Sequence, residues 1–220
     1  MPSEPQLPAE PLCLVFGDED FLVRDRAKQI YEGWCAAAGG MDHEVVDGTV
    51  RNADEALQAL AKLNEALQTL PFFGGNKVVW LRGANFLGDD RTASSAAVTD
   101  RLTELAKSWE SFDWQGVQLL ISAGKVDKRK SFLKTVKKFA ALEDKTVSEK
   151  ERGGRAAMVV RQRLDELGKK ISPHVADELI LLAGANLQQL HTESDKLAAY
   201  VGEREEVTRQ DGHEIATRTK

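Results

Sequence analysis

The first segment of the sequence that could form a chemical site is the loop Gly17–Leu22. It follows an unbroken apolar run, Leu12–Phe16, and precedes residues with helical spacing of apolar side chains. A loop in this place binds nucleotide phosphates when glycines expose backbone N–H groups and a Gly-Lys-Ser or Gly-Lys-Thr sequence supplies a lysine. This loop lacks that lysine and carries Asp18, Glu19 and Asp20, whose charges would repel a triphosphate. The segment therefore predicts an ATPase-like order of elements without ATP binding.

Basic side chains gather between residues 125 and 138, although the chain has 30 lysines and arginines, 35 acidic residues and a formal charge of −5. Overall charge therefore does not make this a polyanion-binding protein, and any DNA contact must come from a local patch. Lys130, Lys134 and Lys137 are spaced to share one helix face. Two interpretations stay open, a solvated helix face or a contact with DNA phosphates or a neighbouring subunit. The candidates for that contact are Lys128, Arg129, Lys130, Lys134 and Lys137.

The remaining reactive residue types form no catalytic or metal-binding pattern. The four histidines are His43, His174, His191 and His213. None stands at the spacing from a cysteine or carboxylate that is typical of a metal site or a catalytic triad. Cys13 and Cys35 form no Cys-x-x-Cys pair, which speaks against zinc and against a disulfide scaffold. We therefore expect no catalytic residue, cofactor or metal.

No stretch of the sequence is long and apolar enough to span a membrane, and the N-terminus is proline-rich and acidic. Export and membrane insertion are therefore not expected. The cysteine usage fits a reducing compartment. The expected location is the cytoplasm.

Strand-like and helix-like apolar patterns alternate through the first two thirds of the chain. The expected strands lie at 12–16, 44–47, 78–81 and 117–121. Helices are expected between and after them, because apolar residues recur every three or four positions, as in Val23, Ala27 and Ile30. One more helix is expected around Phe132 and Phe139. The alternation predicts an α/β fold with a parallel sheet covered on both faces.

Strand patterns stop at the end of that stretch, and only helical patterns follow. Ser172 and Pro173 predict the start of one helix, and Asn186 with Gln189 resembles a capping pair at the start of the next. The last residues, 203–220, are polar and contain no closing apolar element. The expected regions are a disordered leader over 1–11, an α/β domain over 12–150 and a small all-helical domain over 151–220.

The order of these elements, together with the acidic loop, resembles the delta subunit of the bacterial DNA polymerase III clamp loader. The resemblance extends over residues 12–202 and is carried by the order and spacing of several segments. These are Leu14–Leu22, Leu70–Phe73 leading into Lys77–Arg82, Lys125–Lys130, and Gly184–Leu187 through Lys196–Leu197. Delta subunits resemble AAA+ modules and have a RecA-like domain, a three-helix lid and a helical collar. The resemblance implies the first two domains here, without a functional phosphate-binding loop, and a missing collar.

The apolar cluster Leu70–Phe73 precedes Gly74 and Gly75, a pair typical of a surface turn. From the residues alone, both phenylalanines could fold back into the core. In delta subunits the corresponding apolar pair inserts into a pocket on the sliding clamp. The resemblance therefore implies that Phe72 and Phe73 bind the clamp and that Leu70 supports them.

The function implied by the resemblance is that of a subunit which binds and opens the sliding clamp during DNA replication without hydrolysing ATP. It would be a non-catalytic part of the DNA polymerase III holoenzyme. Its expected partners are the sliding clamp (beta subunit), the other clamp-loader subunits and primer-template DNA through the assembled loader. Two alternatives stay open, a protein- or DNA-interaction module that reuses the AAA+ fold and an active P-loop ATPase, which the missing lysine opposes.

Overall fold

The computed structural model describes residues 6–39, 41–69 and 75–217, which divide into two compact units. One unit contains the described residues up to Thr146, and the other begins at Val147. Within these ranges no helix is long and apolar enough to cross a membrane.

The first unit is built on a five-stranded sheet whose neighbouring strands all run parallel. Across the sheet the strands are β2 (Glu44–Asp47), β3 (Lys77–Arg82), β4 (Val117–Ala123), β1 (Leu12–Phe16) and β5 (Ala141–Asp144). The helices are α1 (Asp20–Ala38), α2 (Ala53–Gln68), α3 (Ala96–Glu110) and α4 (Ser131–Val136), with a 3-10 helix, η1 (Asn85–Leu87). Because the strands are parallel, their ends meet at one edge of the sheet, the carboxyl edge, and their starts meet at the other, the amino edge.

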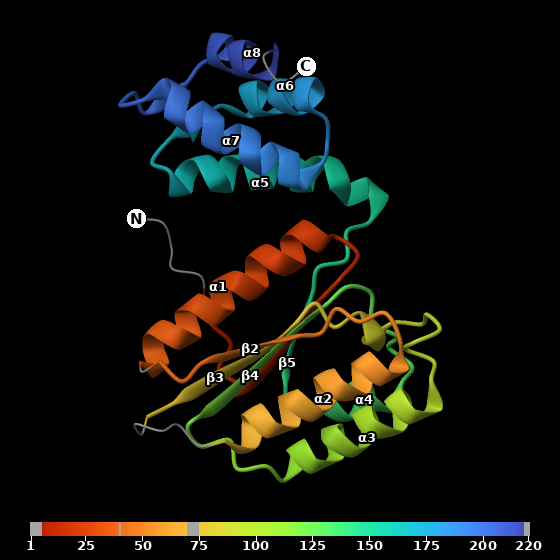
Figure 1. Cartoon of the computed structure of the whole chain (residues 1–220). Helices are drawn as coiled ribbons and strands as arrows, with labels where there is room; N and C mark the ends of the chain where they lie inside the picture. Colours follow the sequence, from red (N-terminus) through yellow and green to blue (C-terminus); the bar gives the residue numbers. More distant parts are fainter. Residues whose placement is uncertain (1–5, 40, 70–74, 218–220) are drawn as a thin grey trace. The chain divides into compact units, whose positions relative to one another are not determined.

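Helices cover both faces of the sheet, which explains why β1 is apolar at every position. Leu12, Leu14 and Phe16 belong to the core that includes residues of α2, α3 and α4. Cys13 and Val15 belong to the core that includes residues of α1. Figure 1 shows α1 on one face of the sheet and the other three helices on the opposite face. The predicted α/β, RecA-like arrangement is therefore confirmed.

The end of this unit differs from the sequence prediction. The helix expected around Phe132 and Phe139 ends at Val136, and Ala141–Asp144 forms the edge strand β5, which no pattern indicated. A tertiary contact stabilises this short strand, because Arg26 of α1 donates two hydrogen bonds of 2.8 Å to the Glu143 carboxylate. Both side chains are about four-fifths buried.

The described part of the leader also differs from the disorder expected over 1–11. Leu7 packs on α1 so closely that a Cβ added to Gly33 would lie 2.7 Å from a Leu7 methyl carbon. The Gln6 carbonyl accepts a hydrogen bond of 2.7 Å from Arg26, and the Pro11 carbonyl accepts one of 2.8 Å from the Leu119 N–H. Residues from Gln6 onward are therefore part of the folded unit.

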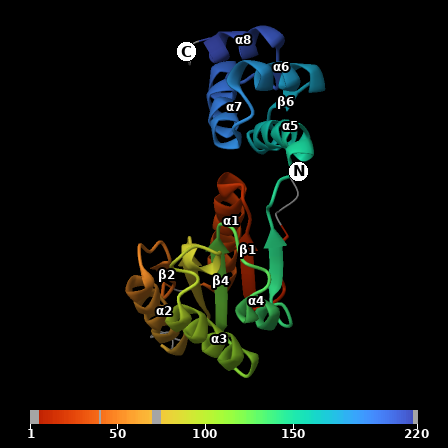
Figure 2. The same cartoon turned by 90° about the vertical axis from the view of Figure 1, so that its right-hand side faces the viewer.

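The second unit is helical, with one short ladder of strands. Its helices are α5 (Glu149–Glu166), α6 (Pro173–Ala183), α7 (Leu187–Val201) and α8 (Arg209–Thr217). In the ladder, β6 (Lys170–Ile171) pairs in parallel with β7 (Glu206–Val207). Within this unit α5 packs against α7, and α6 against α8 (Figure 2).

The predicted helix starts in this unit are confirmed. The Ser172 hydroxyl accepts a hydrogen bond of 3.3 Å from the Val175 N–H, and Pro173 follows it as the first helical residue. The Asn186 side chain accepts one of 2.9 Å from the Gln189 N–H. These caps satisfy N–H groups that have no partner inside their own helix.

The polar residues 203–220 contain a helix that their composition did not indicate. Helix α8 is held by Asp211, whose carboxylate accepts hydrogen bonds from Arg204 and Thr208. Asp211 is 5% exposed, and Ile215 is also buried. The sequence signal was weak because an acid and a basic residue, not an apolar run, hold this segment.

Candidate functional site

The loop between β1 and α1 lies at the carboxyl edge, where parallel α/β sheets bind ligands. Only Gly17, Asp18 and Glu19 separate Phe16, the end of β1, from Asp20, the start of α1. A phosphate-binding loop has the pattern Gly-x-x-x-x-Gly-Lys followed by serine or threonine, and its backbone surrounds the phosphates. The present loop is too short to do this.

The same loop is packed directly against the chain that leaves β5. The Gly17 N–H donates a hydrogen bond of 3.2 Å to the Gly124 carbonyl, and the Lys145 N–H donates one of 2.6 Å to the Phe16 carbonyl. A Cβ added to Gly17 would lie 2.4 Å from the Lys145 carbonyl carbon. A gap too small for one methyl group cannot hold a phosphate, so the place of a phosphate cradle is filled by backbone.

A cleft of about 390 Å³ lies beside this loop at the carboxyl edge. Its charged lining residues are Asp18, Asp89, Asp127, Lys125, Lys128 and Arg129. Lys128 Nζ lies 2.6 Å from Asp144 Oδ2, and Arg129 Nε lies 3.0 Å from Asp127 Oδ1. Acidic and basic side chains are thus balanced, and the cleft does not concentrate positive charge for a polyphosphate.

Hydrogen bonds to these carboxylates explain their ionisation. The side chain and the backbone N–H of Arg129 lower the pKa of Asp127 to about 2. Partial burial tends to raise the pKa of Asp144, but hydrogen bonds from Lys128 and Thr146 lower it overall. Both carboxylates are therefore charged at neutral pH. They pair with Lys128 and Arg129, two of the residues that were candidates for DNA contact.

The predicted helix face of Lys130, Lys134 and Lys137 is not a uniform row of free cations. Lys130 precedes α4, and its ammonium donates to the Gly88 and Ala93 carbonyls at 2.6 and 2.5 Å. Partial burial of the ammonium lowers the pKa of Lys130, because removal from water disfavours the charged form. Lys130 therefore makes internal contacts, which disfavour it as a phosphate ligand, and its role in DNA or subunit contact stays a prediction.

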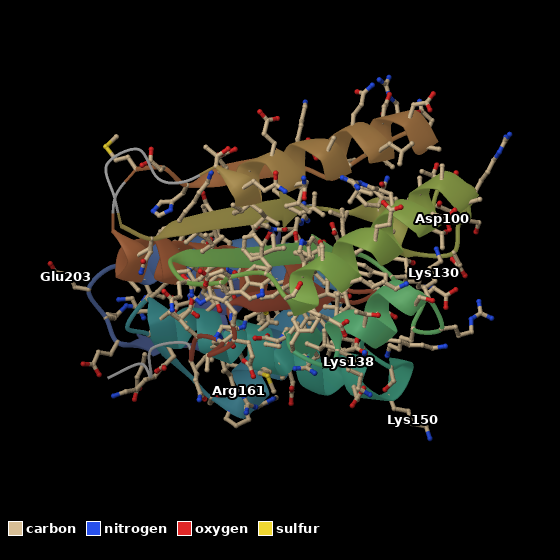
Figure 3. The ribbon with its side chains drawn as sticks, turned by 90° about the horizontal axis from the view of Figure 1, so that it is seen from below. Asp100, Lys130, Lys138, Lys150, Arg161 and Glu203 are labelled. Atoms are coloured by element: carbon tan, nitrogen blue, oxygen red, sulfur yellow. The ribbon has the colours of Figure 1, made fainter. Side chains whose placement is uncertain are left out.

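Lys134 and Lys137 are exposed, and neither forms an ion pair with any residue that the structure describes. Lys130 and Lys138 lie on either side of α4 in the chain and are labelled in Figure 3. Lys138 is paired with Glu110 of α3 at 2.8 Å. Of the five basic candidates, Lys134 and Lys137 are thus the two that are exposed and have no ion-pair partner within the described ranges.

The segment that resembles a clamp-binding tip stands in the chain between α2 and β3, and β3 begins at the opposite, amino edge of the sheet. Leu70, Phe72 and Phe73 lie outside the described residues, so their role stays a prediction. Beside this segment the structure places a residue that sequence reasoning missed. Lys77, the first residue of β3, has a side chain only 2% exposed, and its ammonium lies 2.5 Å from Glu44 Oε1. In the sequence, the position of this lysine directly before an apolar run was the one indication that its side chain could be buried.

Two of the histidines make contacts within their own units. His43 Nδ1 accepts a hydrogen bond of 3.2 Å from the Val78 N–H, and His213 Nε2 lies 3.0 Å from Glu178 Oε1. Among the residues with described positions, no three His, Cys, Asp or Glu side chains gather in a way that could hold a metal ion. These contacts are structural, within the sheet and the helical unit respectively.

A family model described as "DNA polymerase III, delta subunit" matches residues 14–146, more than half of the chain. The chain belongs to the DNA polymerase III delta subunit family. The match begins in β1 and ends at the last residue of the first unit, so it includes the closed loop, the basic run and the segment between α2 and β3. The resemblance drawn from the sequence is therefore confirmed.

Individual relatives of the delta family agree with this assignment. The DNA polymerase III subunit delta of Bacillus subtilis is 23% identical over 215 residues, which cover 95% of this chain and 57% of that protein. The structure of a Bacillus subtilis DNA clamp loader delta protein matches with a TM-score of 0.63 at 22% identity, over 93% of this chain and 57% of that one. The chain thus spans a little over half the length of these relatives.

A more distant structural match lies outside the delta family. The structure titled "E. coli MS115-1 HORMA:CdnC:Trip13 complex" matches with a TM-score of 0.51 at 13% identity, over 96% of this chain and 74% of that one. Identities this low show a shared fold alone.

Proposed function

We propose that this chain binds a sliding clamp and opens it for DNA replication as part of a clamp loader, without hydrolysing ATP itself. The observation that supports the non-hydrolysing role is the loop at Gly17, which is packed against backbone where an ATPase-like fold would hold phosphate. Membership of the delta family supports the clamp-loader role. A non-catalytic subunit of the DNA polymerase III holoenzyme follows from the two together.

Clamp opening without hydrolysis needs a difference in binding affinity. A subunit shifts a clamp from closed to open only if it binds the open form more tightly, because a ligand shifts an equilibrium by its differential affinity alone. In this proposal Phe72 and Phe73 insert into a pocket on the clamp, Leu70 supports them, and the sheet acts as a rigid lever. Aromatic anchors in desolvated pockets supply most of the binding energy in many small interfaces.

The proposal includes the partners of such a subunit. They are the sliding clamp, the other clamp-loader subunits and primer-template DNA held by the assembled loader, in the cytoplasm. For DNA or subunit contact, the exposed and unpaired Lys134 and Lys137 are the favoured residues, since the cations at 128–130 have internal partners.

The clamp-binding proposal is tested by replacing Phe72 and Phe73 together with alanine. Truncation of an anchoring aromatic at a desolvated contact costs about 2–4 kcal/mol, a loss of roughly 30- to 1000-fold in affinity. We expect this loss for binding to the sliding clamp of the same organism, measured by surface plasmon resonance, with an almost unchanged melting temperature. If the phenylalanines were core residues, the same change would instead lower stability by about 3–5 kcal/mol each. Clamp affinity that survives the double substitution would refute the assignment.

The ATP proposal has its own measurement. Isothermal titration of the chain with Mg-ATP or Mg-ADP is expected to give no binding, and a phosphate-release assay no hydrolysis, because the Gly17 loop has neither a lysine nor free space. A micromolar dissociation constant for either nucleotide would favour the alternative of an active P-loop ATPase. Clamp binding without effect on clamp opening would instead favour a general interaction module.

A further inference from the structure

The most deeply buried charged side chain described in the first unit is that of Lys77. It is 2% exposed, and its ammonium lies 2.5 Å from Glu44 Oε1 and 3.3 Å from the Thr69 carbonyl oxygen. Glu44 begins the edge strand β2, and its side chain remains 48% exposed. One ammonium group therefore joins the start of β2, the end of α2 and the start of β3.

Core stability does not require a lysine at this position. Removing an ammonium from water is unfavourable, and apolar replacements of buried ion pairs are often neutral or stabilising. Neighbouring Val78 and Val79 are fully buried, so an apolar side chain would suit this end of the strand. What an apolar residue could not do is donate hydrogen bonds to two separate segments, which points to a positional role for Lys77.

The hydrogen bond from the Lys77 ammonium joins Lys77 to Thr69, and these two residues flank residues 70–76. Thr69 is the C-cap of α2, where its N–H donates a hydrogen bond of 3.0 Å to the Glu65 carbonyl. Lys77 itself is fixed in the sheet, since its N–H donates one of 2.7 Å to the Gly116 carbonyl. The hydrogen bond from the ammonium to the Thr69 carbonyl thus links the two residues that flank the intervening segment, which we call its base. Glu44 holds the ammonium in place.

We infer that Lys77, with Glu44, is a positioning residue that fixes the base of the 70–76 segment and so orients Phe72 and Phe73 for the clamp. The inference rests on the proposed clamp-binding function. Its physical reason is preorganisation: a segment whose ends are already fixed loses less conformational entropy on binding, so more of the contact energy appears as affinity. Neither residue needs to touch the clamp.

The test compares Lys77→Met, Glu44→Gln and the double variant in the full chain. Methionine keeps the length of the lysine stem without the donor, and glutamine keeps the shape of glutamate without the charge. We expect each single variant to bind the clamp about three- to tenfold more weakly. Because both act through one contact, the double variant should be little weaker than Lys77→Met alone. Arg51→Met is the matched control, since it removes an exposed ion pair, with Glu55, at the other end of α2 and should leave clamp affinity unchanged.

A second readout separates positioning from general destabilisation. Amide hydrogen exchange in peptides that cover 69–77 should become faster in both single variants, whereas exchange in β1 and β4 should stay as in the original chain. If Lys77→Met fails to fold, Glu44→Gln decides, because its side chain is half exposed. Clamp affinity within twofold of the original in the folded variants, or an equal loss in Arg51→Met, would overturn the inference.

Failure of the inference can be distinguished from failure of the proposed function. The Phe72 and Phe73 double alanine variant is measured in the same assay. If it loses binding while the Lys77 and Glu44 variants keep it, only the positioning role is wrong. If the original chain does not bind the clamp, or if the double alanine variant binds it equally well, the proposed function and the inference are both wrong.

Discussion

The substitution Gly17→Ala tests whether the loop after β1 is closed. An added Cβ would lie 2.4 Å from the Lys145 carbonyl carbon, 2.7 Å from its oxygen and 2.8 Å from the Thr146 nitrogen. All three atoms belong to the backbone, so no side-chain rotation relieves the overlap. The chain leaving β5 must move away from β1, and the hydrogen bond from the Lys145 N–H to the Phe16 carbonyl must weaken.

The magnitude follows from three contributions. Overpacking costs about 1–3 kcal/mol, and a weakened hydrogen bond costs about 0.5–1.5 kcal/mol. Alanine also restricts the unfolded chain more than glycine does, which offsets about 0.4–1 kcal/mol. We therefore expect the free energy of unfolding of the first unit to fall by about 0.5–4 kcal/mol.

Tryptophan fluorescence during urea unfolding measures this change selectively, because all four tryptophans lie in the first unit. Gly124→Ala is the matched control at the same edge, since a Cβ there would meet nothing within 4 Å. Its unfolding free energy should change by less than about 0.5 kcal/mol. Equal stability of the Gly17→Ala and Gly124→Ala variants would show that the loop has space, and would refute the argument that it excludes phosphate.

Two further predictions concern the basic run and the second unit. Replacing Lys134 and Lys137 with glutamate should weaken DNA binding by the assembled loader and reduce its salt dependence, whereas Lys130→Met should lower stability instead. If the double variant binds DNA as tightly as the original chain at every salt concentration, the two lysines are only part of a solvated helix face. Hydrogen bonds from Arg204 and Thr208 lower the pKa of Asp211 from 3.8 to about 2, so its contribution to stability is complete above about pH 4 and is lost as the pH falls toward 2. An NMR titration should show this low pKa and its rise in Arg204→Met, and an unshifted Asp211 in the original chain would contradict the assigned contacts.

Local sequence patterns were sufficient for most of the first unit. The apolar runs of β1, β3 and β4 and the spaced apolar residues of α1 and α2 are signals that a strand or helix carries within itself. The caps at Ser172 and Asn186 are local in the same sense, because the side chain and its backbone partner are three residues apart. The acidic loop likewise predicted, from residue type alone, that the place of a phosphate cradle would not bind phosphate.

The tertiary structure decided what depends on contacts between distant segments. Strand β5 is short and only partly buried, and it exists through pairing with β1 and the ion pair of Glu143 with Arg26, 117 residues away. Periodicity placed Lys130 with Lys134 and Lys137, but the Gly88 and Ala93 carbonyls, about 40 residues earlier, hold its ammonium. The burial of Lys77 likewise depends on Glu44, 33 residues away. Sequence spacing specifies which side chains share a face of one element, whereas the partner of a charge is set by the packing of elements, and that packing is a property of the whole chain.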